Sequence, residues 1–240
     1  MIQWLKSSYQ REAFFPTWLG VFINPFYFAR AGLSDAMIEF APKLTGCLID
    51  VGCGTQPYRT LFKVCRYVGL DLDSELSRTV GLADQFYDGA TFPYADATFD
   101  SALCNQVLEH VFNPDEFLAE INRVLKPGGK LLLTVPFVWD EHEQPNDYAR
   151  YSSFGLNAIL VKQGFRVLLH KKLGADPSII FQLANAYLYK VTRHLPRVIN
   201  LLITVTLMSV INLSGLLARR MLPGNPDLFL DNVVLVEKPL

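Results

Sequence analysis

The sequence predicts an α/β protein with a mostly parallel sheet, and three observations predict it. From about residue 33 to residue 172, short apolar runs alternate with helical stretches, as in βαβ units. A glycine-rich turn directly follows the first apolar run. The length of 240 residues exceeds the roughly 150 of a typical domain. We therefore expect one α/β domain with additional segments.

Seven apolar runs have the length and composition of strands. The first six lie between residues 47 and 170, and the last stands apart near the C-terminus. Their flanking glycine, proline and polar residues are typical of strand boundaries. The seven runs are Cys47–Val51, Tyr67–Leu70, Gln85–Tyr87, Phe99–Cys104, Lys130–Val135, Phe165–His170 and Asn232–Val236.

One helix is clearly marked between the fourth and fifth of these runs. Asn113 is suited to cap it and Pro114 to occupy its first position. Asp115 and Glu116 follow, where negative charge is favoured by the helix dipole. We expect Pro127-Gly128-Gly129 to stop this helix.

Composition excludes several classes of protein. Lys and Arg number 22 against 23 Asp and Glu, so the chain lacks the basic excess of a nucleic-acid binder, and we expect no nucleic-acid partner. The four cysteines form no CxxC pair and stand in apolar runs, which predicts reduced, buried thiols in a cytoplasmic protein. We expect no disulfide framework, zinc site or secretory signal.

The surplus of apolar residues lies mainly in two segments. Residues 1–32 are rich in aromatic residues, and residues 173–226 interrupt the α/β pattern. Within the second segment, 178–194 is amphipathic, with Gln182 and Asn185 on its polar side. The run 198–218 carries no charge over 21 residues, a length that matches a membrane span.

Basic residues surround these apolar helices. Residues 162–220 carry nine Lys and Arg against a single acid, Asp176, a net charge of +8 that suits an anionic membrane surface. A single span would separate the last strand from its sheet. We therefore expect a monotopic helical pair on the inner face of the membrane. A hairpin that crosses twice, burial in the domain and a homodimer interface are the alternatives.

The turn after the first strand points to the ligand. Gly52 and Gly54 let the backbone approach a ligand, and we expect the turn to direct free N–H groups at it. Pro57 stands where a dinucleotide-binding turn has its third glycine, and Asp50 suits an ammonium or sulfonium group rather than a phosphate. Asp71 follows 21 residues later, where an acid can accept both ribose hydroxyls. Together these residues favour a nucleoside ligand.

At these residues the chain resembles the class I S-adenosylmethionine-dependent methyltransferases, in the small-molecule branch known as type 11. The resemblance covers about residues 44–172 and extends through Leu108–Val111 and Glu120–Gly129. It implies a Rossmann-like fold of seven strands, mostly parallel, with an antiparallel last strand and S-adenosyl-L-methionine as cofactor. The implied cofactor-binding residues are Asp50, Gly52, Cys53, Gly54, Asp71, Leu72, Asp88, Gly89 and Asn105.

The resemblance also implies the domain boundaries. We expect a methyltransferase domain at 33–172 and 227–240, an aromatic N-terminal segment at 1–32 that serves as lid or membrane contact, and an apolar, basic helical insertion at 173–226. The last two strands of the family form an antiparallel hairpin with a short connection. Here the insertion replaces that connection.

Methyl transfer needs alignment and a base for the proton of the nucleophile. His142 and His110 are the candidate bases, since both follow strands whose carboxyl ends face the cofactor, and Glu109 accompanies them. Glu109-His110 also looks like the metal-holding segment of ubiquinone-type O-methyltransferases. Gln106 stands where that group has a further acid, so we expect no metal.

The predicted function is therefore a membrane-associated methyltransferase whose acceptor is a lipid-linked glycan, a quinone or another amphiphile. One alternative is a soluble, dimeric methyltransferase acting on a sugar or small metabolite. The other is a module that binds the cofactor or a membrane without transferring a methyl group. The residues do not distinguish O-, N- and C-methylation.

Overall fold

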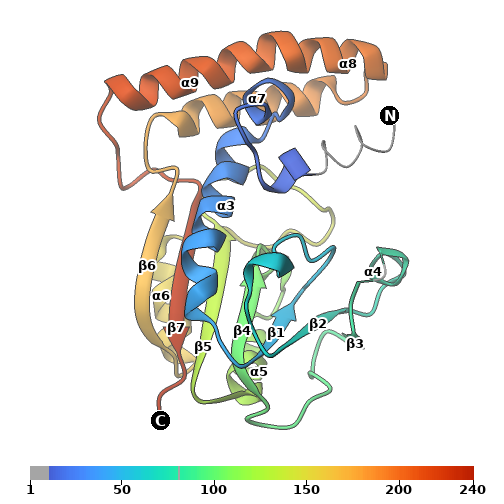
Figure 1. Cartoon of the computed structure of the whole chain (residues 1–240), viewed down its shortest axis with the longest axis vertical. Helices are drawn as coiled ribbons and strands as arrows, with labels where there is room; N and C mark the ends of the chain where they lie inside the picture. Colours follow the sequence, from blue (N-terminus) through green and yellow to red (C-terminus); the bar gives the residue numbers. More distant parts are fainter. Residues whose placement is uncertain (1–10, 81) are drawn as a thin grey trace. The chain divides into compact units, whose positions relative to one another are not determined.

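The computed structural model describes residues 11–80 and 82–240, which form two compact units (Figure 1). The first ten residues of the predicted aromatic segment lie outside the described part. One unit, the sheet unit, comprises residues 37–137, 141–171 and 232–240. The other, the helical unit, comprises residues 11–36, 138–140 and 172–231 of the described chain.

The sheet has seven strands in the order β3-β2-β1-β4-β5-β7-β6. Strands β1, β2, β3, β4 and β5 run parallel, and backbone hydrogen bonds between Gly128, Gly129 and Lys238 pair β7 antiparallel to β5. This confirms the predicted fold class and the antiparallel last strand. The strands are β1 (Cys47–Val51), β2 (Arg66–Leu72), β3 (Gln85–Tyr87), β4 (Phe99–Asn105), β5 (Leu125–Pro136), β6 (Arg166–Leu173) and β7 (Asp231–Glu237).

Register brings the ends of the central strands together. Asp50 of β1 lies opposite Gly69 of β2 and Leu103 of β4. Carboxyl ends of parallel strands meet at one edge of the sheet, so the segments that follow β1, β2, β4 and β5 share that edge. The candidate site residues come from these segments.

Helices of the sheet unit cover an apolar core. In α5 (Pro114–Val124), Leu118 and Ile121 are fully buried, and in α6 (Ser153–Lys162) Leu156 and Leu160 are too; all four pack with Ile49, Val51, Leu131 and Leu133 of the sheet. Burial of such side chains stabilises the fold by about 1.5–3 kcal/mol each. The shorter helices are η1 (Ala41–Lys43), η2 (Arg59–Leu61), α4 (Glu75–Val80) and η3 (Leu108–His110).

Of the expectations about α5, the start is confirmed in position and the end is wrong. Asn113 is the N-cap residue and Pro114 is the first residue of the helix, but the Asn113 side chain makes no capping hydrogen bond and its amide donates to the Glu116 carboxylate. The helix ends at Val124, before the Pro127-Gly128-Gly129 signal. Leu125 is buried and pairs with Phe99 in the sheet, and the residue before a proline avoids helical geometry, so residues 125–129 already belong to β5.

The cysteine prediction holds in part. Cys47, Cys53, Cys65 and Cys104 are all free thiols. Cys53 and Cys104 are buried, as expected, and burial raises the pKa of the Cys53 thiol to about 12. The expectation of buried thiols is wrong for the other two: Cys47 is half-buried, and Cys65, which lies just before the first residue of β2, is exposed.

The helical unit is built on two long helical segments. One is α7 (Ser178–Thr192), and the other runs without a break through α8 (Arg197–Ile203), the π-helical turn η4 (Thr204–Met208) and α9 (Ser209–Met221). Helices α7 and α9 lie side by side (Figure 1). The short helix α2 (Gly20–Ile23) and the start of α3 (Tyr27–Phe40) complete the unit.

Polar side chains hold the N-terminal backbone inside this unit. The Gln182 side chain accepts from the N–H groups of Phe28 and Ala29 and donates to the carbonyl of Pro25. The Asn212 amide donates to the carbonyls of Val21 and Asn24. These amide side chains are buried, so the predicted polar side of 178–194 faces inward rather than toward water.

Candidate active site

The turn after β1 is shaped by its two glycines. A Cβ on Gly52 would lie 2.5 Å from the Val107 side chain, so only glycine fits there. Gly54 has a φ of +48°, and a Cβ there would meet no atom within 4 Å. The backbone at Gly54 therefore borders open space, which is the cradle a cofactor needs.

The N–H groups of this turn are occupied by the protein. Those of Gly52 and Cys53 donate to the carbonyl of Leu70, and that of Gly54 donates to the Asp71 carboxylate at 3.0 Å. The expectation that the turn directs free N–H groups at a ligand is wrong for these three residues. A turn whose amides are engaged is not a phosphate cradle, which agrees with a nucleoside ligand.

Asp71 is fixed at the end of β2. Its carboxylate accepts from the N–H groups of Gly54 and Leu72, the second at 2.8 Å. Close by, a Cβ on Gly89 would lie 3.2 Å from the Leu72 side chain, so the β2 end and the Asp88-Gly89 turn approach each other. Asp88 itself accepts from the backbone N–H groups of Ala90 and Thr91, which lowers its pKa.

Asp50 is a buried carboxyl group next to this turn. The Tyr67 hydroxyl donates to it at 2.5 Å. Burial raises the pKa of Asp50 to about 7, although the Tyr67 hydrogen bond opposes the shift. A cationic group bound near Asp50 would favour its ionised form, and this fits the sulfonium and ammonium groups of S-adenosylmethionine.

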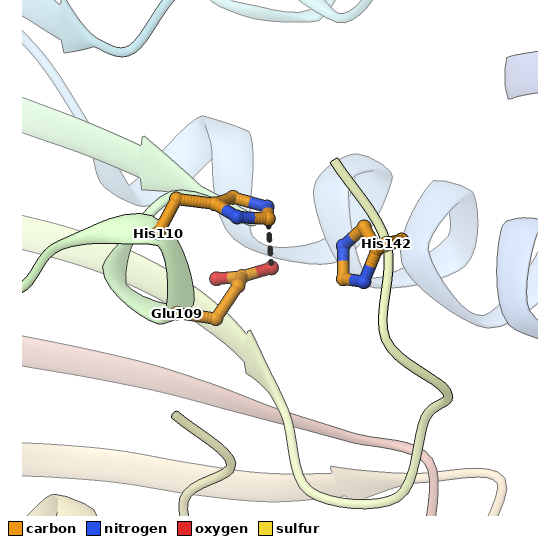
Figure 2. A group of neighbouring side chains, drawn as sticks. All are labelled: Glu109, His110 and His142. Carbon is orange, nitrogen blue, oxygen red and sulfur yellow. Dashed lines mark ion pairs between the residues drawn. The ribbon is translucent and has the colours of Figure 1, made fainter. Parts of the chain in front are cut away.

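The three predicted catalytic residues lie together (Figure 2). Glu109 and His110 lie in η3 after β4, and His142 lies in the loop after β5. His110 Nε2 is 3.9 Å from Glu109 Oε1, and the two imidazole rings meet edge to face with centroids 4.8 Å apart. Glu109 is fully buried, whereas both histidines are half-buried.

The same cluster has the composition of a cation site. One ligand atom from each of Glu109, His110 and His142 lies within 4.8 Å of the others. A carboxylate with two imidazoles suits a divalent transition metal. Gln106 contributes no charge beside them: its side-chain amide donates to the Thr134 hydroxyl, which in turn donates to the Asn105 side chain.

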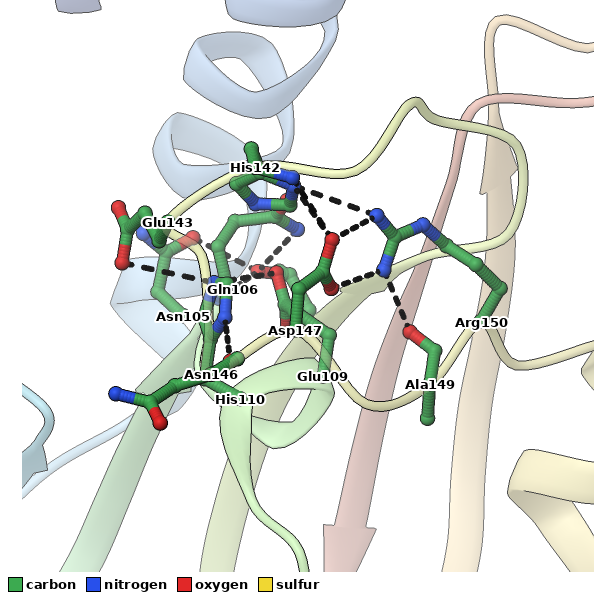
Figure 3. A network of polar contacts seen from close by, with 11 residues as sticks. Asn105, Gln106, Glu109, His110, His142, Glu143, Asn146, Asp147, Ala149 and Arg150 are labelled. Atoms are coloured by element: carbon green, nitrogen blue, oxygen red, sulfur yellow. Dashed lines mark hydrogen bonds and ion pairs between the residues drawn. The ribbon is translucent and has the colours of Figure 1, made fainter.

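A second layer of contacts orients both histidines (Figure 3). His110 Nδ1 lies 2.7 Å from the Asn146 carbonyl. His142 Nδ1 lies 3.4 Å from Asp147 Oδ2, and the backbone N–H of His142 donates to the same carboxylate at 2.8 Å. Arg150 binds Asp147 through two nitrogens and, with the other contacts, lowers the Asp147 pKa to about 2.

Sequence reasoning missed Asp147. Its side chain is only 4% exposed and is the central residue of the network. The available signal was its spacing, because Asp147 precedes Arg150 by three residues in a loop that already carried a candidate base. Such i, i+3 pairs are common, so the spacing alone does not distinguish a structural ion pair from a site.

Comparison with known proteins identifies the domain that contains part of this site. Residues 49–133 match a family described as a methyltransferase domain. The match runs from β1 to β5 and includes the glycine turn, Asp71 and the Glu109-His110 pair. The chain carries a class I S-adenosylmethionine-dependent methyltransferase domain. This confirms the predicted family, enzyme class and cofactor.

Individual relatives cover this methyltransferase domain to different extents. An uncharacterised protein of Methanocaldococcus jannaschii is 27% identical over 155 residues, which are 60% of this chain and 73% of that protein. The tRNA (carboxymethyluridine(34)-5-O)-methyltransferase of Arabidopsis thaliana is 30% identical over 114 residues, 45% of this chain but only 28% of that enzyme. The shared region is therefore the domain rather than the whole of the longer relative.

A solved structure shows the same fold. Geranyl diphosphate C-methyltransferase from Streptomyces coelicolor A3(2), determined with Mg²⁺, geranyl-S-thiolodiphosphate and S-adenosyl-L-homocysteine, matches with a TM-score of 0.56. The match covers 88% of this chain and 80% of that chain at 15% identity.

The raised pKa of Asp50 predicts a pH dependence of folding stability. In the folded chain Asp50 stays protonated up to about pH 7, whereas in the unfolded chain it ionises near pH 4. The free energy of unfolding should therefore fall as pH rises from 4 to 7, by up to about 4 kcal/mol. In urea unfolding, Asp50→Asn should lose this decline and the exposed Asp73→Asn should keep it. Equal pH profiles for the wild type and Asp50→Asn would contradict the assignment.

Proposed function

We propose that this methyltransferase works at a membrane surface and methylates an amphiphilic acceptor, such as a lipid-linked glycan or a quinone. The observation that supports it is the inverted polarity of the helical unit, which buries amide side chains and exposes aliphatic ones. The surface helices of soluble proteins normally turn their apolar side toward the protein core.

Helix α7 shows the inversion most simply. Gln182 and Asn185 are fully buried, and the Asn185 amide donates to the Met208 carbonyl and the Asn212 side chain. In contrast, Ile180 and Tyr187 are 61% and 71% exposed. The surface of this helix is therefore more apolar than its packed side.

The longer segment repeats the pattern. Ser209 and Asn212 are buried, and only 28% of its most apolar stretch is buried. The exposed aliphatic side chains spread along its whole length, and contiguous exposed apolar surface is typical of sites that bind a membrane or another protein. They are Val198, Ile199, Leu201, Leu202, Val205, Leu207, Val210, Leu213, Leu217, Met221 and Leu222.

A position in the plane of the interface fits these helices better than a crossing. The segment Arg197–Met221 is long and apolar enough to span a bilayer. However, the insertion begins after β6 and ends before β7, and these two strands are neighbours in one sheet. One crossing would separate them, and α7, with 15 residues, measures about 22 Å against a core of about 30 Å. We therefore propose a monotopic attachment on the cytoplasmic face.

Basic residues complete this surface. Arg193 is exposed just after α7, Arg197 is exposed as the first residue of α8, and Arg220 is exposed near the end of α9. Arg219 instead pairs with Asp176 at 3.2 Å. Exposed arginines beside an apolar face favour anionic lipids.

Vesicle sedimentation tests the attachment. At about 1 kcal/mol for each basic residue, replacing Arg193 and Arg197 by Gln should weaken binding to anionic vesicles roughly thirtyfold at low salt. The matched double variant Lys63→Gln/Arg66→Gln, with two exposed basic residues of the sheet unit, should bind like the wild type. A wild-type protein that stays in the supernatant and forms a stable dimer through these helices would replace membrane attachment by dimerisation.

The residues around the cofactor divide the chemistry between them. Bound S-adenosylmethionine supplies the methyl group, already activated by its sulfonium. We assign Asp71 to the ribose hydroxyls, Asp50 and the 52–54 turn to the methionine end, and Leu72, Asp88, Gly89 and Asn105 to the remaining contacts. His142, held by Asp147, removes the acceptor proton, and His110 with Glu109 orients the acceptor.

Cofactor affinity tests the role of Asp71. Asp71→Ala leaves buried hydroxyl partners unpaired, which costs about 2 kcal/mol or more, so calorimetry should show binding of S-adenosylmethionine weakened at least tenfold. Asp73→Ala is the matched control, because Asp73 is exposed and pairs with Arg78 on the surface. Unchanged affinity in Asp71→Ala would refute the ribose assignment.

Turnover tests the role of His142. Positioned proton transfer contributes a factor of about 10²–10⁴ to the rate. In His142→Ala, the rate of radiolabel transfer from the cofactor into extracted lipid should fall by that factor. The affinity of this variant for S-adenosylmethionine should stay unchanged. The exposed His194→Ala should stay at wild-type turnover. If His110→Ala alone shows the loss, the two histidines exchange roles.

A further inference from the structure

The helical unit contains a cavity that the methyl-transfer chemistry does not use. It measures about 190 Å³ and lies among residues 12–14, 23–26, Arg30 and Tyr189. Typical pockets for whole small molecules measure roughly 300–1,000 Å³. This cavity is therefore of a size for one compact group rather than for a complete amphiphile.

Aromatic rings form much of its wall. Phe14, Phe26 and Tyr189 all line it, and Phe26 meets Tyr189 edge to face with centroids 4.9 Å apart. Ile23 and Pro25 add aliphatic surface. Such walls suit the carbon atoms of a ligand and exclude water from any polar contact made between them.

Two hydrogen-bond donors on the wall are unused. The Arg30 guanidinium lies 5.1 Å from the Phe14 ring centroid and forms no ion pair within residues 11–80 and 82–240. The Tyr189 hydroxyl makes no hydrogen bond to any residue of that same part of the chain. A ligand for this cavity must therefore bring acceptor oxygens and a negative charge.

The charge of that ligand is limited by Glu12, which also lines the cavity. Its two carboxylate oxygens accept from the Thr17 N–H and hydroxyl, each at 2.7 Å, so these two hydrogen bonds fix the carboxylate in the wall. A group with two negative charges would be repelled by Glu12. One negative charge balances Arg30 and adds no further repulsion.

We propose that this cavity binds the phosphodiester headgroup of a membrane phospholipid. Arg30 and Tyr189 donate to the phosphate oxygens, and Phe14 and Phe26 cover the adjoining carbon atoms. A phosphodiester carries one charge, and a phosphomonoester carries nearly two. The assignment of this phosphodiester to a membrane lipid rests on the proposed membrane attachment. The cavity and its two hydrogen-bond donors are observed independently of that proposal.

The test is a calorimetric titration of the full chain with dihexanoylphosphatidylglycerol below its micellar concentration. Saturable binding is expected, weakened at least tenfold in Arg30→Gln and several-fold in Tyr189→Phe. Arg30→Lys should recover part of the affinity. The matched control is Arg66→Gln, which removes an exposed arginine of the sheet unit and should leave the affinity unchanged.

Three results would overturn the proposal: no binding by the wild type, unchanged binding in both Arg30→Gln and Tyr189→Phe, or equal affinity for inorganic phosphate. If Arg30→Gln lowers the melting temperature, Tyr189→Phe decides, because it removes a single oxygen. Vesicle sedimentation separates the two proposals. Sedimentation without short-chain binding refutes the headgroup site alone, and short-chain binding without sedimentation refutes membrane attachment alone.

Discussion

The pairing of β1 with both β2 and β4 is the constraint on which the active site depends. With β1 in the centre, the segments that follow these strands have to leave the sheet at one edge, within reach of each other. The consequence is visible in single contacts, such as the Gly54 N–H that reaches the Asp71 carboxylate. It also explains why Gly52 admits no side chain, since Val107 after β4 occupies that space.

The helical unit is held together largely by hydrogen bonds of buried amide side chains. Its long-range order comes from amide side chains that satisfy backbone groups of residues 21–29, rather than from an apolar interface alone. Buried amides are stable only when they are hydrogen-bonded, and here each of Gln182 and Asn212 makes at least two such bonds. Since amide side chains occupy much of the inward side, many aliphatic residues of the same helices lie on the surface.

Much of the sheet unit was predictable, because its signals are local. All seven strands occur where the apolar runs predicted them, and Cys47–Val51 and Gln85–Tyr87 match to the residue. The end of α5 was mispredicted because Leu125 pairs with Phe99 in the sheet, so the helix ends before it reaches the Pro-Gly-Gly signal. Asp147 was missed because its importance arises from contacts with His142 and Arg150, which no residue spacing reveals. The periodicity of 178–194 gave two sides correctly but could not say which one faces inward.

The hydrogen bonds that hold residues 21–29 also set an order of assembly during synthesis. The acceptor carbonyl of Asn24 is made early, but its donor, Asn212, lies 188 positions further along the chain. At about 5–20 residues per second, roughly 10–40 s pass before the ribosome has added that donor. The carbonyls of Val21 and Asn24 must therefore remain hydrated or be sheltered by another protein until residue 212 has been added, and truncation before Asn212 would leave these two carbonyls without that donor.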